Sequence, residues 1–154
     1  MPTFFSGYLG APPASRSQPW RTGDRVHQDE DGYLYFDGRA DDVIISSGYR
    51  IGPFEVESAC IEHPAVREAA AVASPDERRG SVVKAFIVLA EGREPSDALA
   101  DEIKAFVRDR LSAYAYPRRI EFVTDLPKTL TGKIRRIELR EREAESAAAA
   151  SDAS

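Results

Sequence analysis

Two arginines eleven residues apart, Arg39 and Arg50, flank a short apolar run of Val43, Ile44 and Ile45. The run is β-branched and bounded by polar residues, which is typical of a buried strand. Arginine carries a permanent charge and a planar fork of donors that fits phosphate and carboxylate oxygens. The pattern therefore allows two interpretations, an anion site or a strand with charged flanks.

Lys133 is a second candidate for chemistry. It lies in residues 126–134 (LPKTLTGKI), a loop rich in hydroxyl groups with a glycine directly before the lysine. Such a loop allows close backbone approach, and its lysine can place a positive charge beside a developing negative charge. The loop does not match a Walker phosphate loop, because Pro127 and Ile134 stand where that motif needs Gly and Ser or Thr. Spacing alone favours an ordinary surface lysine.

The charge distribution is uneven. The chain has a formal net charge of -5, which argues against a general nucleic-acid binder. Residues 117–142 nevertheless hold eight Lys or Arg against four Asp or Glu. This surplus suggests a local anionic ligand, with a solvated helix face as the alternative. Tyr114 and Tyr116, with Arg118 and Arg119, could bind a nucleotide or cap a helix end.

The remaining reactive residues give weaker signals. His27 and His63 lack the spacing of metal ligands, and Cys60 is typical of a small core residue, so we expect no metal site in this chain. A single cysteine excludes an internal disulfide. No apolar run is long enough for a membrane span and no signal pattern opens the chain. We therefore expect a cytoplasmic protein.

The surrounding elements predict a small α+β domain, in which a hairpin precedes a mixed sheet of about three strands with packed helices. An Asp-Gly turn predicts the hairpin over residues 25–36. Further strands are expected over residues 66–73, 81–90 and 119–124, and helices over residues 54–62, 97–111 and 134–143. Residues 1–22 read as a linker, and residues 144–154 as a disordered tail.

Three stretches carry a resemblance to a known family: residues 22–24 (TGD), 38–57 (GRADDVIISSGYRIGPFEVE) and 126–134. Their order and spacing resemble those of the adenylate-forming acyl-CoA synthetases, over about residues 3–142. Details look most like the medium-chain branch, in particular residues 46–53 (SSGYRIGP), 79–86 (RGSVVKAF) and 116–122 (YPRRIEF).

The resemblance implies a two-step ligase. A carboxylic acid attacks the α-phosphate of ATP, supplied with Mg²⁺, to give an acyl-adenylate and pyrophosphate. The thiol of coenzyme A then displaces AMP. A small C-terminal domain would turn against a large N-terminal domain between the two steps.

The same resemblance implies roles for five residues on the nucleotide side. Asp24 would accept hydrogen bonds from the ribose hydroxyls, and Arg39 and Arg50 would contact the nucleotide or its phosphates. Asp41 would be the hinge. Lys133 would bridge the carboxylate substrate and the α-phosphate during adenylation only.

A coenzyme A path is implied as well. The pantetheine channel would be bordered by Ser47, Gly48 and Tyr49, with Gly48 keeping it unobstructed. The nucleotide end of coenzyme A would meet four residues: Arg79, Tyr116, Pro117 and Arg118.

The large N-terminal adenylation domain of that family is absent from this sequence. Residues 1–36 resemble its end, and residues 37–143 resemble the C-terminal domain. We therefore expect a fragment of a ligase that is inactive without an N-terminal partner. The alternative is a stand-alone module that binds coenzyme A or a nucleotide without catalysis.

Overall fold

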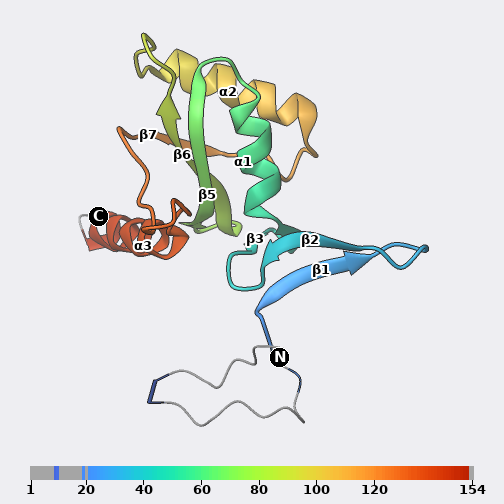
Figure 1. Cartoon of the computed structure of the whole chain (residues 1–154). Helices are drawn as coiled ribbons and strands as arrows, with labels where there is room; N and C mark the ends of the chain where they lie inside the picture. Colours follow the sequence, from blue (N-terminus) through green and yellow to red (C-terminus); the bar gives the residue numbers. More distant parts are fainter. Residues whose placement is uncertain (1–8, 11–18, 20, 153–154) are drawn as a thin grey trace.

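A computed structural model of the chain describes residues 9–10, 19 and 21–152. Within them, three helices pack with strands that form three separate sheets (Figure 1). The α+β class is therefore confirmed. Most of the linker predicted over residues 1–22 lies outside the described residues.

The first hairpin is formed by β1 (Asp24–Gln28) and β2 (Leu34–Arg39), and it projects from the rest of the domain (Figure 1). The Asp29 carboxylate closes its turn by accepting two backbone amides of that turn. The predicted hairpin is confirmed, but β2 continues three residues further than expected. This extension places Arg39 opposite Asp24 across the strand pair.

A second, shorter hairpin joins β3 (Ile44–Ser46) to β4 (Tyr49–Ile51). Ser47 and Gly48 form its two-residue loop with φ angles of 50° and 83°. Two left-handed residues in a row give the strand twist that a tight hairpin requires. The expectation of one strand with an arginine beyond each end is therefore wrong, because Arg50 lies in the middle of β4.

The central sheet has the order β5 (Val66–Asp76), β6 (Gly80–Leu89) and β7 (Arg119–Phe122). β5 and β6 are antiparallel, whereas β6 and β7 are parallel. A parallel pair requires a crossover, and here the crossover contains a helix. The predicted mixed sheet of three strands is confirmed.

Helices cover both faces of this sheet (Figure 1). α1 (Pro53–Ile61) and α2 (Asp97–Arg110) pack on one face, and α3 (Arg136–Asp152) packs on the other. Because side chains of a strand alternate between faces, β5 and β6 contribute to two clusters. The α1–α2 side buries Ala69, Ala71, Val83, Ala85 and Ile87. The α3 side buries Ala70, Val72, Phe86 and Val88.

The helix ends follow sequence signals. Pro53 is the first residue of α1, where its missing amide hydrogen has no cost. The Ser96 hydroxyl accepts a hydrogen bond from the Leu99 amide at 3.2 Å and so caps α2.

α3 differs from its prediction. Sequence reasoning ended this helix near Glu143 and expected disorder beyond it, but α3 continues to Asp152. The added residues are mostly alanines, which have the highest intrinsic helix propensity. None of the helices in the described part of the chain is both long and apolar enough to cross a membrane.

Candidate functional site

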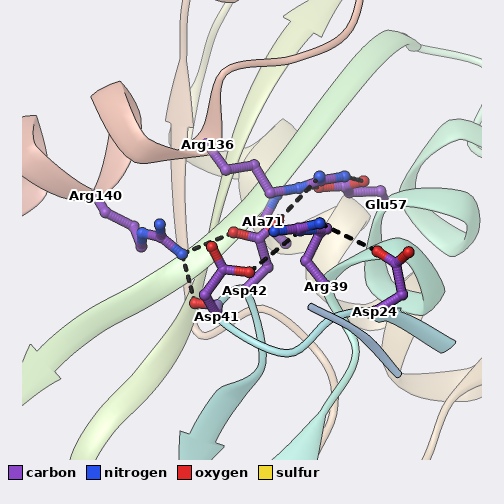
Figure 2. Close-up of polar contacts among 8 residues, drawn as sticks. All are labelled: Asp24, Arg39, Asp41, Asp42, Glu57, Ala71, Arg136 and Arg140. Carbon is purple, nitrogen blue, oxygen red and sulfur yellow. Dashed lines mark hydrogen bonds and ion pairs between the residues drawn. The ribbon is translucent and has the colours of Figure 1, made fainter. Parts of the chain in front are cut away.

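Arg39, at the end of β2, brings Asp24 and Asp41 together (Figure 2). Its Nη1 lies 3.2 Å from Oδ1 of Asp24 and donates to the Thr22 carbonyl at 2.7 Å. Its Nε donates to Oδ1 of Asp41 at 3.3 Å. The three side chains are 35% to 62% exposed. Two predicted nucleotide residues and the predicted hinge thus form one open cluster.

Arg50 lies apart from this cluster on β4. Its side chain is exposed and forms no hydrogen bond or ion pair with another described residue. It lines an open pocket together with Arg25 and Phe36 of the first hairpin and Phe54 of α1. Asp24, Arg39 and Asp41 do not line this pocket, so the structure places Arg50 on a different part of the surface.

The loop between β3 and β4 gathers four of the residues predicted for coenzyme A. Arg79 contacts Ser47 twice, through its carbonyl to the Ser47 amide at 3.3 Å and through Nη1 to Oγ at 3.4 Å. Tyr49 stacks on Tyr114, with ring centroids 4.2 Å apart and planes 8° apart. Gly48 lies between Ser47 and Tyr49 in the chain. One surface therefore holds Ser47, Gly48, Tyr49 and Arg79.

The left-handed conformation of Ser47 gives this loop a strained backbone. Ser47, with φ of 50°, is the one residue other than glycine with positive φ in the described chain. A side chain at Gly48 would meet no atom of the chain within 4 Å, so the backbone angle, not crowding, calls for glycine here. Strain of this kind gathers at functional sites.

Tyr116, Pro117 and Arg118 lead into β7. The Arg118 guanidinium lies 5.0 Å from the centroid of the Tyr116 ring, and Pro117 is fully buried. The Arg118 amide donates to the Val83 carbonyl at 2.9 Å, which begins the pairing with β6. These residues therefore have fixed positions, although no hydrogen bond or ion pair between described residues links them to Arg79.

In the Lys133 loop, hydrogen bonds hold the backbone while the lysine side chain is exposed. The Thr129 amide donates to the Lys133 carbonyl at 2.8 Å, and the Lys133 amide donates back to Oγ1 of Thr129 at 3.1 Å. Gly132, with φ of 82°, allows the turn, and the backbones of Lys128 and Ile134 form an isolated antiparallel β-bridge. The Lys133 side chain is exposed and has no ion-pair partner among the described residues.

Most of the basic residues in the surplus of residues 117–142 form ion pairs within the chain. Six of its eight cations form ion pairs with the chain's own carboxylates: Arg119, Lys128, Arg135, Arg136, Arg140 and Arg142. In the described structure, Arg118 and Lys133 are the two that lack such a partner. These are the two that the resemblance assigns to ligands.

Sequence reasoning missed a buried network between α1 and α3 (Figure 2). The Glu57 carboxylate accepts from Nε of Arg136 at 2.8 Å, from Nη2 at 2.6 Å and from the Ala71 amide at 2.9 Å. The hydrogen bond to Glu57 raises the pKa of Arg136. Asp42 joins through Arg136 at 3.4 Å and Arg140 at 2.7 Å. The only signals in the sequence were the basic surplus and Asp42, an acidic residue to which no role was assigned.

Cys60 and His63 have structural surroundings. Cys60 is fully buried, and burial together with the Glu57 charge raises the pKa of its thiol to about 12, so it is not a nucleophile. Nδ1 of the buried His63 accepts from the Ala65 amide at 3.2 Å. Within the described residues, no group of three or more His, Cys, Asp or Glu side chains could hold a metal ion.

The model of the AMP-binding enzyme C-terminal domain family matches residues 55–133, just over half of the chain. The chain belongs to this family. The matched region contains Arg79, the residues around Tyr116 and, at its end, Lys133. Asp24, Arg39 and the β3–β4 loop precede it.

Relatives of the whole domain are acyl-CoA ligases by name. The chain is 58% identical over 146 residues to rat (Rattus norvegicus) "Acyl-coenzyme A synthetase ACSM4, mitochondrial", covering 91% of this chain and 25% of the rat protein. It is 60% identical over 124 residues to "4-hydroxybutyrate--CoA ligase 1" of Metallosphaera sedula, covering 80% of this chain and 22% of that protein. The chain thus spans about a quarter of the length of these relatives.

Solved structures agree. The crystal structure of a Brucella canis acyl-CoA synthetase superposes with a TM-score of 0.68 at 57% identity, covering 82% of this chain and 23% of that one. The anthranilate CoA ligase AuaEII, in complex with anthranoyl-AMP, gives a TM-score of 0.76 at 46% identity, covering 82% and 25%. Membership of the AMP-binding C-terminal family and these matches favour the ligase-domain interpretation over a stand-alone binding module.

Proposed function

We propose that the chain is the C-terminal domain of an acyl-CoA ligase and acts together with an N-terminal adenylation domain. In the complete enzyme, a carboxylate substrate attacks the α-phosphate of ATP, which gives acyl-AMP and releases pyrophosphate. The coenzyme A thiol then attacks the acyl carbon and releases AMP. We assign Mg²⁺ to the ATP substrate and not to this chain, which in its described part holds no cluster of metal-ligating side chains.

The observation that carries the proposal is the Lys133 loop. Its backbone is held by reciprocal hydrogen bonds with Thr129, while the ammonium group has no ion-pair partner in the described part of the chain. A positively charged ammonium group on a positioned backbone can stabilise negative charge that develops during a reaction. Lys133 would supply it between the substrate carboxylate and the α-phosphate in the adenylation step.

The nucleotide would meet the Asp24–Arg39 cluster. Arg39 donates a hydrogen bond to Oδ1 of Asp24, whereas Oδ2 of Asp24 has no hydrogen-bond partner among the described residues. A carboxylate oxygen is an acceptor, which suits the ribose hydroxyls. Arg50 is exposed on β4 and has no ion-pair partner among the described residues, so it would be available for the nucleotide or its phosphates once the two domains meet.

The coenzyme A side would be the surface of the β3–β4 loop and the residues before β7. Arg118, which has no ion-pair partner in the described part of the chain, suits the phosphates at the nucleotide end of coenzyme A. Tyr116 and Pro117 lie beside it in the sequence, and Arg79 would be a further cation. Ser47, Gly48 and Tyr49 would line the path of the pantetheine arm. Strain at Ser47 supports a functional role for this loop.

Two further proposals concern the complete enzyme. Asp41 would be the hinge on which this domain turns between adenylation and thioester formation. We also propose a cytoplasmic location, while noting that the rat relative is named mitochondrial. The isolated chain is expected to be inactive, and nucleic acid is not among its expected partners.

A chimera tests the proposal. The part of the Metallosphaera sedula ligase that precedes its match would be joined to the matching 124 residues of this chain, and AMP release would be measured with 4-hydroxybutyrate, ATP and coenzyme A. We expect substrate-dependent release. Lys133→Ala should slow acyl-AMP formation by roughly 10²–10³, but should leave thioester formation from supplied acyl-AMP near the unsubstituted rate.

Arg135→Ala is the matched control, because Arg135 is an exposed cation near Lys133 whose ion-pair partner is Glu138. It should leave both half-reactions near the unsubstituted rates. A folded chimera that releases no AMP, when the intact parent ligase does, contradicts the proposed function. Unchanged adenylation in Lys133→Ala contradicts the role of Lys133 alone.

A further inference from the structure

We infer that Arg140 fastens the peptide bond between Asp41 and Asp42 to α3, and thereby confines rotation at this junction to the backbone dihedrals of Asp41. Arg140 is thus a positioning residue that acts through the hinge. The inference deepens the proposed function and rests on it for the expectation that the junction rotates. Figure 2 shows the side chains that carry it.

Everything up to the Asp41 side chain is bonded to the first hairpin. The Ala40 amide donates to the Gly23 carbonyl at 2.8 Å. The Asp41 carboxylate accepts from Nε of Arg39, which is the last residue of β2. These bonds would move Asp41 with the hairpin and with whatever the hairpin is attached to.

The next residue belongs to the body of the domain. Oδ1 of Asp42 accepts from Arg140 at 2.7 Å, and Oδ2 accepts from Arg136 at 3.4 Å. Its side chain is only 12% exposed. Asp41 is therefore held by the first hairpin and the Asp42 side chain by α3. If the hairpin and the body of the domain move relative to one another, the rotation occurs between these two residues.

α3 is a firm anchor for Asp42. Its Arg136 makes a two-point ion pair with Glu57 of α1. One turn beyond Arg140, the buried Glu143 accepts from Lys84 of β6 and from Ser74 of β5. A guanidinium extended from this helix has a fixed origin, because the helix is tied to both α1 and the sheet.

The peptide unit between the two aspartates has its own bond to α3. Nη1 of Arg140 donates to the Asp41 carbonyl at 2.6 Å as well as to the Asp42 carboxylate. Turning φ of Asp42 would carry that carbonyl away from Arg140. Turning ψ of Asp41 would leave the Asp41 carbonyl beside Arg140. It would break a different hydrogen bond, which the Asp42 amide donates to the Arg39 carbonyl at 3.2 Å.

The two bonds differ in strength. The bond from Arg140 has a charged donor, whereas the bond to the Arg39 carbonyl joins neutral groups, and charge-assisted hydrogen bonds are roughly twice as strong. Rotation should therefore occur at Asp41. Without Arg140, φ of Asp42 becomes a further free dihedral and the hairpin samples more orientations.

The test measures a distance distribution across the junction in the full 154-residue chain. Nitroxide labels on Glu30→Cys, in the exposed turn of the first hairpin, and Ala105→Cys, exposed on α2, report the hairpin orientation by pulsed electron spin resonance. Cys60 should not react, because it is fully buried and the pKa of its thiol is raised to about 12. We expect one or two narrow distance peaks.

Arg140→Met keeps the length and apolar stem of the side chain but removes both bonds. It should broaden the peaks about twofold, since φ of Asp42 then becomes free in addition to ψ of Asp41. Arg140→Lys keeps a charge opposite Asp42 on a shorter stem and should broaden them as well. The matched control is Arg142→Met on the same helix, which loses its ion pair with Glu121 and should leave the distribution unchanged.

The melting temperature of each variant separates positioning from stability. A general loosening of α3 would lower the melting temperature and broaden the peaks in the Arg142 variant too, which would overturn the inference. So would unchanged peaks in both Arg140 variants. These outcomes need no catalytic step, so they stay distinct from a failure of the chimera to release AMP.

Discussion

Arg136 and Glu57 form a two-point ion pair that joins α3 to α1 across 79 positions of the sequence. The Glu57 side chain is 6% exposed and that of Arg136 is 22% exposed. Oε1 of Glu57 also accepts the Ala71 amide of β5. One carboxylate therefore connects both helical layers to the sheet between them.

Replacing this carboxylate should destabilise the domain. Glu57→Gln keeps an acceptor for the Ala71 amide, but it leaves the partly buried Arg136 charge with only the longer contact to Asp42, at 3.4 Å. Losing one member of a buried pair costs about 3–5 kcal/mol, and the partial exposure of Arg136 places our expectation near 3 kcal/mol. Urea unfolding measures the change.

Glu62→Gln is the control for that substitution. Glu62 pairs with Arg110 at 2.9 Å, but these side chains are 62% and 42% exposed. An exposed pair contributes less than about 1 kcal/mol. Equal losses in the two variants would show that burial of the Glu57–Arg136 pair adds nothing to its contribution.

Cys60 should make the stability depend on alkaline pH. Burial raises the pKa of its thiol from 9.0 to about 12, so between these values the folded chain keeps a proton that the unfolded chain releases. The stabilisation is complete below pH 9 and is lost as pH rises towards 12, by up to about 1.4 kcal/mol per pH unit. Cys60→Ala should remove this slope, which urea unfolding at pH 9.0, 9.75 and 10.5 would measure. A slope that the substitution leaves unchanged contradicts the assignment to Cys60.

Local signals predicted most of the fold. The Asp-Gly turn located the first hairpin, and Ser96 located the start of α2. The β3–β4 hairpin was missed because Ser47 occupies a left-handed position that usually takes Asn, Asp or Gly, and because Arg50 interrupts the apolar pattern. Alanines after Glu143 were read as a tail because they carry no amphipathic pattern, although they propagate a helix well.

The site was predictable only where residues lie close in sequence or resemble a known motif. Asp42 meets Arg136 and Arg140 across more than ninety positions, and no local pattern specifies such a pair. The excess of arginines in residues 117–142 was visible, but their partners depend on how α3 packs on the sheet. Tertiary packing thus decides which of these cations pair with carboxylates and which, such as Lys133, have no ion-pair partner in the described part of the chain.

Gly23→Ala should disturb the Arg39 cluster. Gly23 has φ of 79°, and a Cβ there would lie 2.9 Å from Nη2 of Arg39. The substitution should therefore have two effects. It should cost about 1–2 kcal/mol of backbone strain, and it should displace the Arg39 side chain. We expect faster hydrogen exchange of the Ala40 amide, which donates to the Gly23 carbonyl. Gly32→Ala carries similar strain at φ of 88°, but its nearest contact is Gln28 at 3.5 Å, so it should leave the Ala40 amide protected. Equal exchange at Ala40 in both variants would mean that strain alone explains the effect.

The Tyr49–Tyr114 stack should matter for coenzyme A and not for adenylation. Tyr114 lies just beyond α2 and supports the ring of Tyr49, which we place beside the pantetheine arm. Stacked aromatic pairs contribute about 0.5–1.5 kcal/mol, which corresponds to a roughly two- to tenfold rise in KM for coenzyme A when the stack is lost. In the chimera, Tyr114→Leu should show that rise with an unchanged rate of acyl-AMP formation, whereas Tyr114→Phe keeps the ring and should behave as the unsubstituted chimera. An unchanged KM in Tyr114→Leu would remove Tyr49 from the coenzyme A path, because its position would then be irrelevant to binding.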